Sequence, residues 1–108
     1  MSDRYQFTFE RMDVFRLAVE VNHWFGRTKW PRGRAGMRHQ GQRAIDSVVC
    51  NIAEGVSKGG GGGQQALRIA AGEAGEAFAT LCCVELPGAD EQRQKLRRVA
   101  AMLHKMSR

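Results

Sequence analysis

Apolar residues recur at helical spacing in four stretches of the chain, and this periodicity restricts the fold more than any other feature. Residues three and four apart share a face of a helix, so each stretch would carry one apolar stripe. The expected helices span residues 9–25, 35–54, 64–86 and 90–106. Amphipathic helices with short connections pack well as an up-down-up-down bundle. The sequence therefore predicts an all-α fold: an antiparallel four-helix bundle forming a single domain over residues 1–108.

Proline and glycine mark the breaks between these segments. Pro31 and Gly33 interrupt the first connection, "RTKWPRGRAG", and "LPGAD" separates the third and fourth segments, with Asp90 as the expected N-cap of the last helix. The bundle would have an alanine-rich core and a short, basic fourth helix. A small domain buries a limited fraction of its surface, which favours oligomerisation.

The most unusual segment is "SKGGGGGQQ", residues 57–65, which joins the second and third expected helices. A phosphate-binding P-loop places lysine and then serine or threonine after its glycines. Here Lys58 precedes the glycines, no hydroxyl residue opens the helix, and no strand leads in. Ordering five glycines also costs backbone entropy. The stretch therefore predicts a flexible, mobile linker, with Gly55 capping the helix before it.

Composition indicates a compartment and excludes some classes of protein. No stretch approaches the roughly 18 apolar residues of a membrane span, and "MSDRYQFTFER" lacks the layout of a signal peptide. These features predict a cytoplasmic protein with no membrane partner. The three cysteines form neither a CxxC pair nor a disulfide framework, so we expect buried, reduced thiols.

Charge is distributed unevenly along the chain, whose net charge is +6. Six cations and no acid lie between Val21 and Ile45, and six more without an acid lie between Gln92 and Arg108. The intervening segment is mainly acidic. Arginine supplies 13 of the 17 cations, and its planar guanidinium suits phosphate. In an antiparallel bundle, the first connection and the start of the fourth helix share one end, so the basic blocks should converge.

This convergence, with Trp30 set among arginines, suggests a nucleic-acid-binding surface. Arginine would bind phosphate while tryptophan stacks on an exposed base. Alternatively, Trp24 and Trp30 close the bundle end and the arginines only confer solubility. The candidate nucleic-acid-binding residues are Arg27, Lys29, Trp30, Arg32, Arg34, Arg38, Arg43, Arg93, Lys95, Arg97 and Arg98.

Polar residues on the second helix offer a different candidate site. Ser47, Asn51 and Glu54 share one face beside the apolar stripe. They could form a ligand site; alternatively, Asn51 hydrogen-bonds across the bundle and Glu54 pairs with an arginine or a neighbouring helix start, fixing the register.

Catalytic and metal-binding patterns are missing from the sequence. No Glu-x-x-His repeat accompanies the glutamates of the expected second and third helices, and the three histidines lie in separate segments. No nucleophile has a recognisable base. We therefore expect no catalytic residue, no metal, no cofactor and no enzymatic activity.

The segment "QGQRAIDSVVCNIAEG", residues 40–55, resembles the signature of bacterial four-helix-bundle proteins encoded within 23S ribosomal RNA intervening sequences. That signature is approximately Q-x-R-R-A-x-x-S-I-x-x-N-I-A-E-G. "LRIAAGEAGE" and "MDVFRLAVEV" are similar to further parts of the same family. The signature residues matched here are Gln40, Arg43, Ala44, Ser47, Asn51, Ile52, Ala53, Glu54 and Gly55.

The resemblance implies an antiparallel bundle that assembles as a ring-like pentamer and has no enzymatic activity. A distantly similar protein is the basic pentameric accessory of diversity-generating retroelements, which binds nucleic acid and a reverse transcriptase. The chain departs from the family pattern in its glycine run, in Glu73 where the family has serine, and in its shorter last helix.

Two functions follow as hypotheses. The first is a non-enzymatic, oligomeric bundle that binds RNA or DNA through arginine-rich patches, as an accessory to a nucleic-acid-processing partner such as a reverse transcriptase. The alternative is a structural or protein-interaction module that binds no nucleic acid and engages another protein through its acidic third helix.

Overall fold

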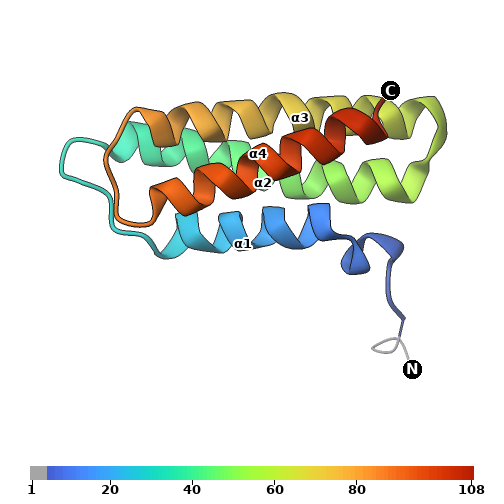
Figure 1. The fold of residues 1–108 in the computed structure, drawn as a ribbon, viewed down its shortest axis with the longest axis horizontal. Coiled ribbons are helices and arrows are strands. Elements are labelled where there is room, and N and C mark those ends of the chain that lie inside the picture. The colour runs from blue at the N-terminus through green and yellow to red at the C-terminus, as the bar shows by residue number, and fades with distance from the viewer. Residues whose placement is uncertain (1–4) are drawn as a thin grey trace.

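The computed structural model describes residues 5–108, which form four long helices after one short 3-10 turn (Figure 1). The turn, η2, spans Thr8–Arg11. The helices are α1 (Asp13–Arg27), α2 (Ala35–Lys58), α3 (Gly60–Cys82) and α4 (Ala89–Met106). Successive helices run in opposite directions along the long axis. The predicted all-α, antiparallel four-helix bundle is confirmed.

Each helix packs against two neighbours, and the most extensive contact joins α2 to α3. Within the described chain, the diagonal pairs α1/α3 and α2/α4 make no close backbone contact, so the core lies along the central axis. Alanines of α2 and α3 are buried in it, as the small side chains at that interface require. The largest fully buried side chains are Phe25, Ile45, Ile52, Leu81, Leu96 and Leu103.

The two ends of the bundle carry different segments of the chain. One end, called the loop end here, carries the α1–α2 connection (residues 28–34) and the α3–α4 turn (residues 83–88). Arg34 joins these segments by donating from Nη2 to the Cys83 carbonyl at 3.0 Å. The opposite end, called the turn end, carries the α2–α3 junction, the N-terminal segment and the C-terminus (Figure 1).

The glycine run is helical, so the predicted flexible linker and the predicted cap at Gly55 are both wrong. α2 continues to Lys58, Gly59 alone separates the helices, and α3 begins at Gly60. Gly59 has a φ of +67° and caps α2 by donating its N–H to the Gly55 carbonyl at 3.1 Å. Gly60 also has a positive φ, +60°, and this conformation favours glycine at both positions where the chain reverses.

Close approach of the backbones explains why Gly55 and Gly63 lie inside helices. A Cβ atom on Gly63 would lie 2.5 Å from the Gly55 carbonyl oxygen, and one on Gly55 would lie 2.7 Å from the Leu67 side chain. Both glycines are buried. Ordering the glycine run costs backbone entropy, which was the reason for predicting a flexible linker. Packing of α2 on α3 at this junction offsets that cost.

Other helix limits also differ from expectation. Residues 8–11 form the 3-10 turn, so α1 begins at Asp13, and Glu10 accepts the Phe7 N–H at 2.7 Å. The N-cap of α4 is Gly88 with a φ of +86°, whereas Asp90, the predicted cap, lies within the helix.

Exposure of the cysteines contradicts a further expectation. Cys50, Cys82 and Cys83 are reduced but exposed rather than buried. Cys50 lies on the outer face of α2, and the other two lie where α3 ends and no helix covers them. None of the helices in residues 5–108 has the length and apolar character needed to cross a membrane.

Candidate nucleic-acid interface

A concave pocket of about 520 Å³ lies at the loop end, between the end of α1 and the start of α2. We call it the cationic pocket. Four cations line it, and no carboxylate of the described chain does. Residues 26–33, Ala35 and Arg38 line it, and among them are Arg27, Lys29, Trp30 and Arg32.

Local structure explains how the pocket gathers these residues. Arg27 ends α1, Arg38 lies in the first turns of α2, and Lys29 and Arg32 come from the connection. A turn closes the connection where the Arg34 N–H donates to the Pro31 carbonyl at 3.1 Å. The Arg34 guanidinium is hydrogen-bonded to the α3–α4 turn. Arg34 therefore fixes the connection through both its backbone N–H and its side chain.

Trp30 forms part of the pocket wall while packing against the core. Its ring stacks on Phe25, with centroids 5.7 Å apart, and Phe25 is fully buried. The Trp30 Nε1 atom is buried and has no hydrogen-bond partner among residues 5–108. Trp24 is also buried and packs edge-on against Phe25. Both tryptophans therefore close the bundle end, and Trp30 in addition faces the pocket.

The pocket is electrostatically uncompensated. In the described part of the chain, its four cations form no ion pair with a carboxylate. The first turn of α2 contains no acid and lacks a side-chain cap. The negative dipole end of α1 and the positive dipole end of α2 both lie at the pocket and oppose each other, so its positive field comes from the side chains. Uncompensated cations in a concave site attract anions, and the planar guanidinium of arginine matches the geometry of phosphate.

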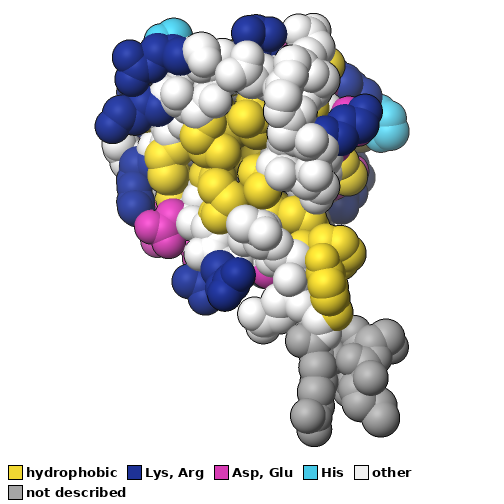
Figure 2. Space-filling view, turned by 90° about the vertical axis from the view of Figure 1, so that its right-hand side faces the viewer, with side chains coloured by type: hydrophobic (Ala, Val, Ile, Leu, Met, Phe, Trp, Pro, Cys, Tyr) yellow, Lys and Arg dark blue, Asp and Glu magenta, His cyan; other side chains and the backbone are white. Residues whose placement is uncertain are grey.

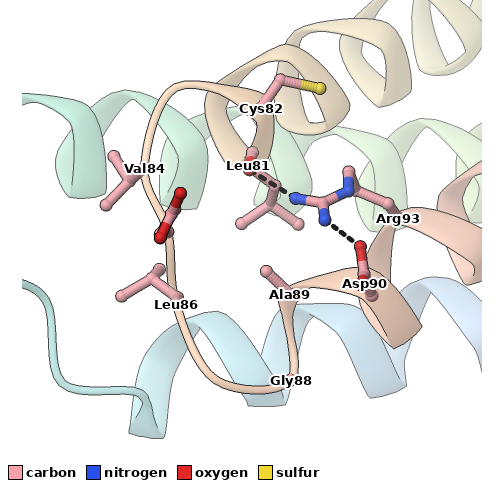
Figure 3. Close-up of a pocket in the computed structure, with 9 residues that line it drawn as sticks. Leu81, Cys82, Val84, Leu86, Gly88, Ala89, Asp90 and Arg93 are labelled. Atoms are coloured by element: carbon pink, nitrogen blue, oxygen red, sulfur yellow. Dashed lines mark hydrogen bonds and ion pairs between the residues drawn. The ribbon is translucent and has the colours of Figure 1, made fainter.

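The second basic block begins at the loop end, as expected, but three of its six cations contact other groups of the protein. Arg93 donates to the Leu81 carbonyl at 2.7 Å and pairs with Asp90 (Figure 3). Lys95 pairs with Glu20 of α1 at 3.0 Å. The Arg97 guanidinium lies 4.7 Å from the centre of the Phe78 ring. Arg98 is exposed and pairs with no acid of residues 5–108.

A second concave surface surrounds Arg93 but has a different character (Figure 3). Glu85 and Asp90 lie in its wall beside the single cation, and the rest is mostly apolar. Its carboxylates offset the charge of Arg93, so this surface is a poorer anion site than the cationic pocket.

Arg43 lies apart from the cationic pocket and links α2 to α3. Its guanidinium contacts Glu73 at 3.2 Å and Glu76 at 3.3 Å. A hydrogen bond with Glu76, aided by Arg43 and Ser47, lowers the pKa of Glu73 below its usual 4.5. The same hydrogen bond and the Glu73 charge raise the pKa of Glu76. The two carboxyl groups thus hold one proton more readily than two separate glutamates would.

Asn51 and Glu54 of the polar signature bond within α2 rather than across the bundle. Asn51 donates from Nδ2 to the Ser47 carbonyl at 2.9 Å and to the Ser47 hydroxyl at 3.0 Å, both within α2. Glu54 pairs with Lys58 of the same helix at 3.5 Å. The register interpretation of Asn51 and Glu54 is therefore wrong. Gly55 has the cross-helix role instead, because its lack of a side chain admits α3.

An apolar surface at the turn end was missed in the sequence. Figure 2 views this end, where hydrophobic side chains fill the centre and continue toward the N-terminal segment. The rings of Tyr5, Phe7, Phe9 and Phe15 form a continuous series with centroids 4.7–5.3 Å apart. Tyr5 is 69% exposed and Phe7 is 50% exposed. The alternating aromatic residues in "YQFTF" are the sequence pattern that could have predicted this apolar surface.

Across residues 5–108, no group of three or more His, Cys, Asp or Glu side chains could hold a metal ion.

Comparisons with protein-family models, curated proteins and solved structures give no match to the chain.

Proposed function

We propose that this protein is a non-enzymatic, oligomeric helical bundle that binds RNA or DNA at its loop end. The observation that supports this proposal is the cationic pocket, where four cations without carboxylate partners line one concave surface. Phosphates that enter such a site release condensed counterions, and this release drives association. Binding is accordingly salt-dependent and weakly specific for sequence.

The structural contacts rank the eleven candidate residues. Arg27, Lys29, Arg32 and Arg38 contact phosphate in the pocket, and Trp30 supplies an apolar wall. Arg98 extends the basic surface, and Arg34 chiefly fixes the α1–α2 connection through its bond to the Cys83 carbonyl. The remaining cations act mainly in holding the bundle together, because they contact acids, a carbonyl oxygen or an aromatic ring of the protein; they are Arg43, Arg93, Lys95 and Arg97.

Oligomerisation would multiply the effect of each pocket. The resemblance noted in the sequence suggests a pentamer and an accessory role beside a partner such as a reverse transcriptase. The exposed aromatic rings at the turn end supply apolar surface for assembly, far from the loop end. Several weak phosphate sites on one assembly then act together on one strand. A protein-interaction module without nucleic-acid binding is the alternative that the experiment below separates.

The test measures binding of labelled RNA and DNA oligonucleotides over a salt series. The variant Arg27→Gln/Arg32→Gln/Arg38→Gln removes three pocket cations. Its matched control, Arg11→Gln/Arg16→Gln/Arg68→Gln, removes three exposed cations that form no ion pair within the described chain. Both variants lose the same charge.

On a single strand, each phosphate contact contributes about 0.7 to the magnitude of the slope of log K against log salt. Loss of three contacts should therefore reduce the magnitude of this slope by about 2. The control should keep most of the wild-type slope. Absence of binding by the wild-type protein at low salt, or equal losses in the two variants, would refute a role for the pocket.

A further inference from the structure

We infer that the cationic pocket selects single-stranded over double-stranded nucleic acid by admitting the phosphate and base of one nucleotide. This inference rests on the proposed function and adds the class of nucleic acid. Three properties of the loop end support it: the concave position of the cations, the aromatic wall and the fixed connection.

The position of the cations favours a flexible strand. A volume of about 520 Å³ falls within the range of sites that enclose a small ligand, roughly 300–1,000 Å³. Arg27 and Arg38 come from two helix ends and Lys29 and Arg32 from the loop between them, so phosphate must enter the concavity to contact several together. Single-strand backbone torsions can rotate a phosphate inward.

A duplex cannot make this adjustment without losing base pairs. Its phosphates are held in a regular array that rises about 3.4 Å per nucleotide along the helix axis on each strand, set by base stacking. Proteins that read duplexes usually project a helix or a strand pair into a groove. Here the cations line an inward-curving surface where α1 ends and α2 begins, so a duplex would contact only its rim.

The aromatic wall provides a surface for the base. Trp30 lines the pocket, and the fully buried Phe25 supports one face of its ring. A ring fixed in this way loses little freedom when a base packs against it. Every nucleobase has an apolar face, so such packing tolerates any sequence. Bases in a duplex are stacked on each other and are unavailable for this contact.

The connection is also ordered before ligand arrives. The turn from Pro31 to Arg34 and the bond from Arg34 to the Cys83 carbonyl fix it on both sides. Gly33, with a φ of +86°, permits the reversal at the rim. A pre-formed pocket avoids the entropy cost of ordering a loop on binding, which strengthens discrimination by shape.

The primary test is competition on the wild-type protein at one salt concentration. A labelled single-stranded 20-mer is displaced by unlabelled single-stranded RNA, single-stranded DNA, and the duplex of the same sequence. The single strands should compete roughly tenfold or more better than the duplex per nucleotide, since only they can place a base and a phosphate in the pocket. The two single-stranded arms show which sugar is preferred.

A second measurement locates the preference. The triple pocket variant at Arg27, Arg32 and Arg38 should lower the single-strand to duplex ratio toward one, while the control at Arg11, Arg16 and Arg68 should keep it. A duplex that competes as well as the single strands overturns the inference and leaves the proposed function standing. A ratio unchanged in the pocket variant also overturns it. Failure of every oligonucleotide to bind refutes the proposed function itself.

Discussion

Replacing Gly63 with alanine should destabilise the bundle, whereas the same replacement at the adjacent Gly62 should stabilise it. Both residues lie in the first turns of α3 and have ordinary helical backbone. A Cβ atom on Gly62 would meet nothing within 4 Å, whereas one on Gly63 would lie 2.5 Å from the Gly55 carbonyl oxygen. The pair therefore separates helix propensity from close packing.

The magnitudes follow from these contacts. Alanine is favoured over glycine within a helix by about 1 kcal/mol, so Gly62→Ala should raise the free energy of unfolding by up to that amount. Gly63→Ala gains the same propensity, but backbone must move by nearly 1 Å to reach an ordinary contact of about 3.4 Å. Overpacking typically costs about 1–3 kcal/mol, and because the obstacle here is a rigid carbonyl, we expect a cost of about 2–3 kcal/mol. A net loss of about 1–2 kcal/mol is expected.

Urea and thermal unfolding followed by far-ultraviolet circular dichroism would measure both variants. Protein concentration must be equal, because assembly would couple stability to concentration. The two variants should differ by about 2–3 kcal/mol, or about 10 °C in Tm. If Gly63→Ala were as stable as Gly62→Ala, the close approach of α2 and α3 would be refuted. If both were neutral, the glycine run would be the flexible linker that the sequence suggested.

Three further predictions concern the core and the carboxylate pair. Gly41→Ala would place a Cβ 2.5 Å from the Phe25 ring and should cost about 1–3 kcal/mol in urea unfolding; a stability equal to wild type would contradict this packing. Gln92 is buried with an Oε1 atom that has no partner in residues 5–108, so Gln92→Leu should leave stability unchanged or raise it by about 1 kcal/mol. Glu73 has a lowered pKa, so its stabilising contribution is present above its usual pKa and is lost as the pH falls through the folded-state pKa. Glu73→Gln should therefore be less stable than wild type by about 1 kcal/mol at neutral pH, and this difference should shrink as the pH falls through the folded-state pKa of Glu73. A difference that stays constant with pH would show that ionisation of Glu73 does not contribute to stability.

The sequence determined the helical segments and the uneven charge. Helical spacing of apolar residues depends on local geometry, so it identified four helices and their order without tertiary information. It also indicated that the first connection and the start of the fourth helix share an end, because antiparallel topology with short connections leaves little choice. Arg27, Lys29, Arg32 and Arg38 were recognisable as a group because the chain between them is short.

Only the tertiary structure decided which cations remain uncompensated. Arg43 and Arg93 have the same charge as Arg38, yet they contact carboxylates, and in the case of Arg43 these come from another helix. Sequence spacing cannot show such pairing across helices, because it depends on rotation and offset of one helix against the next. The cationic pocket is therefore a tertiary feature built from residues that sequence had marked only as basic.

Tertiary packing also decides the backbone conformation of the glycine run. From local propensity alone, five glycines favour an unfolded connection, since each loses more entropy on ordering than any other residue. The structure places four of them, Gly60–Gly63, in a helix because the backbone of Gly63 packs directly against Gly55. Sequence determines what each residue prefers in isolation, whereas close packing between two helices determines whether that preference prevails.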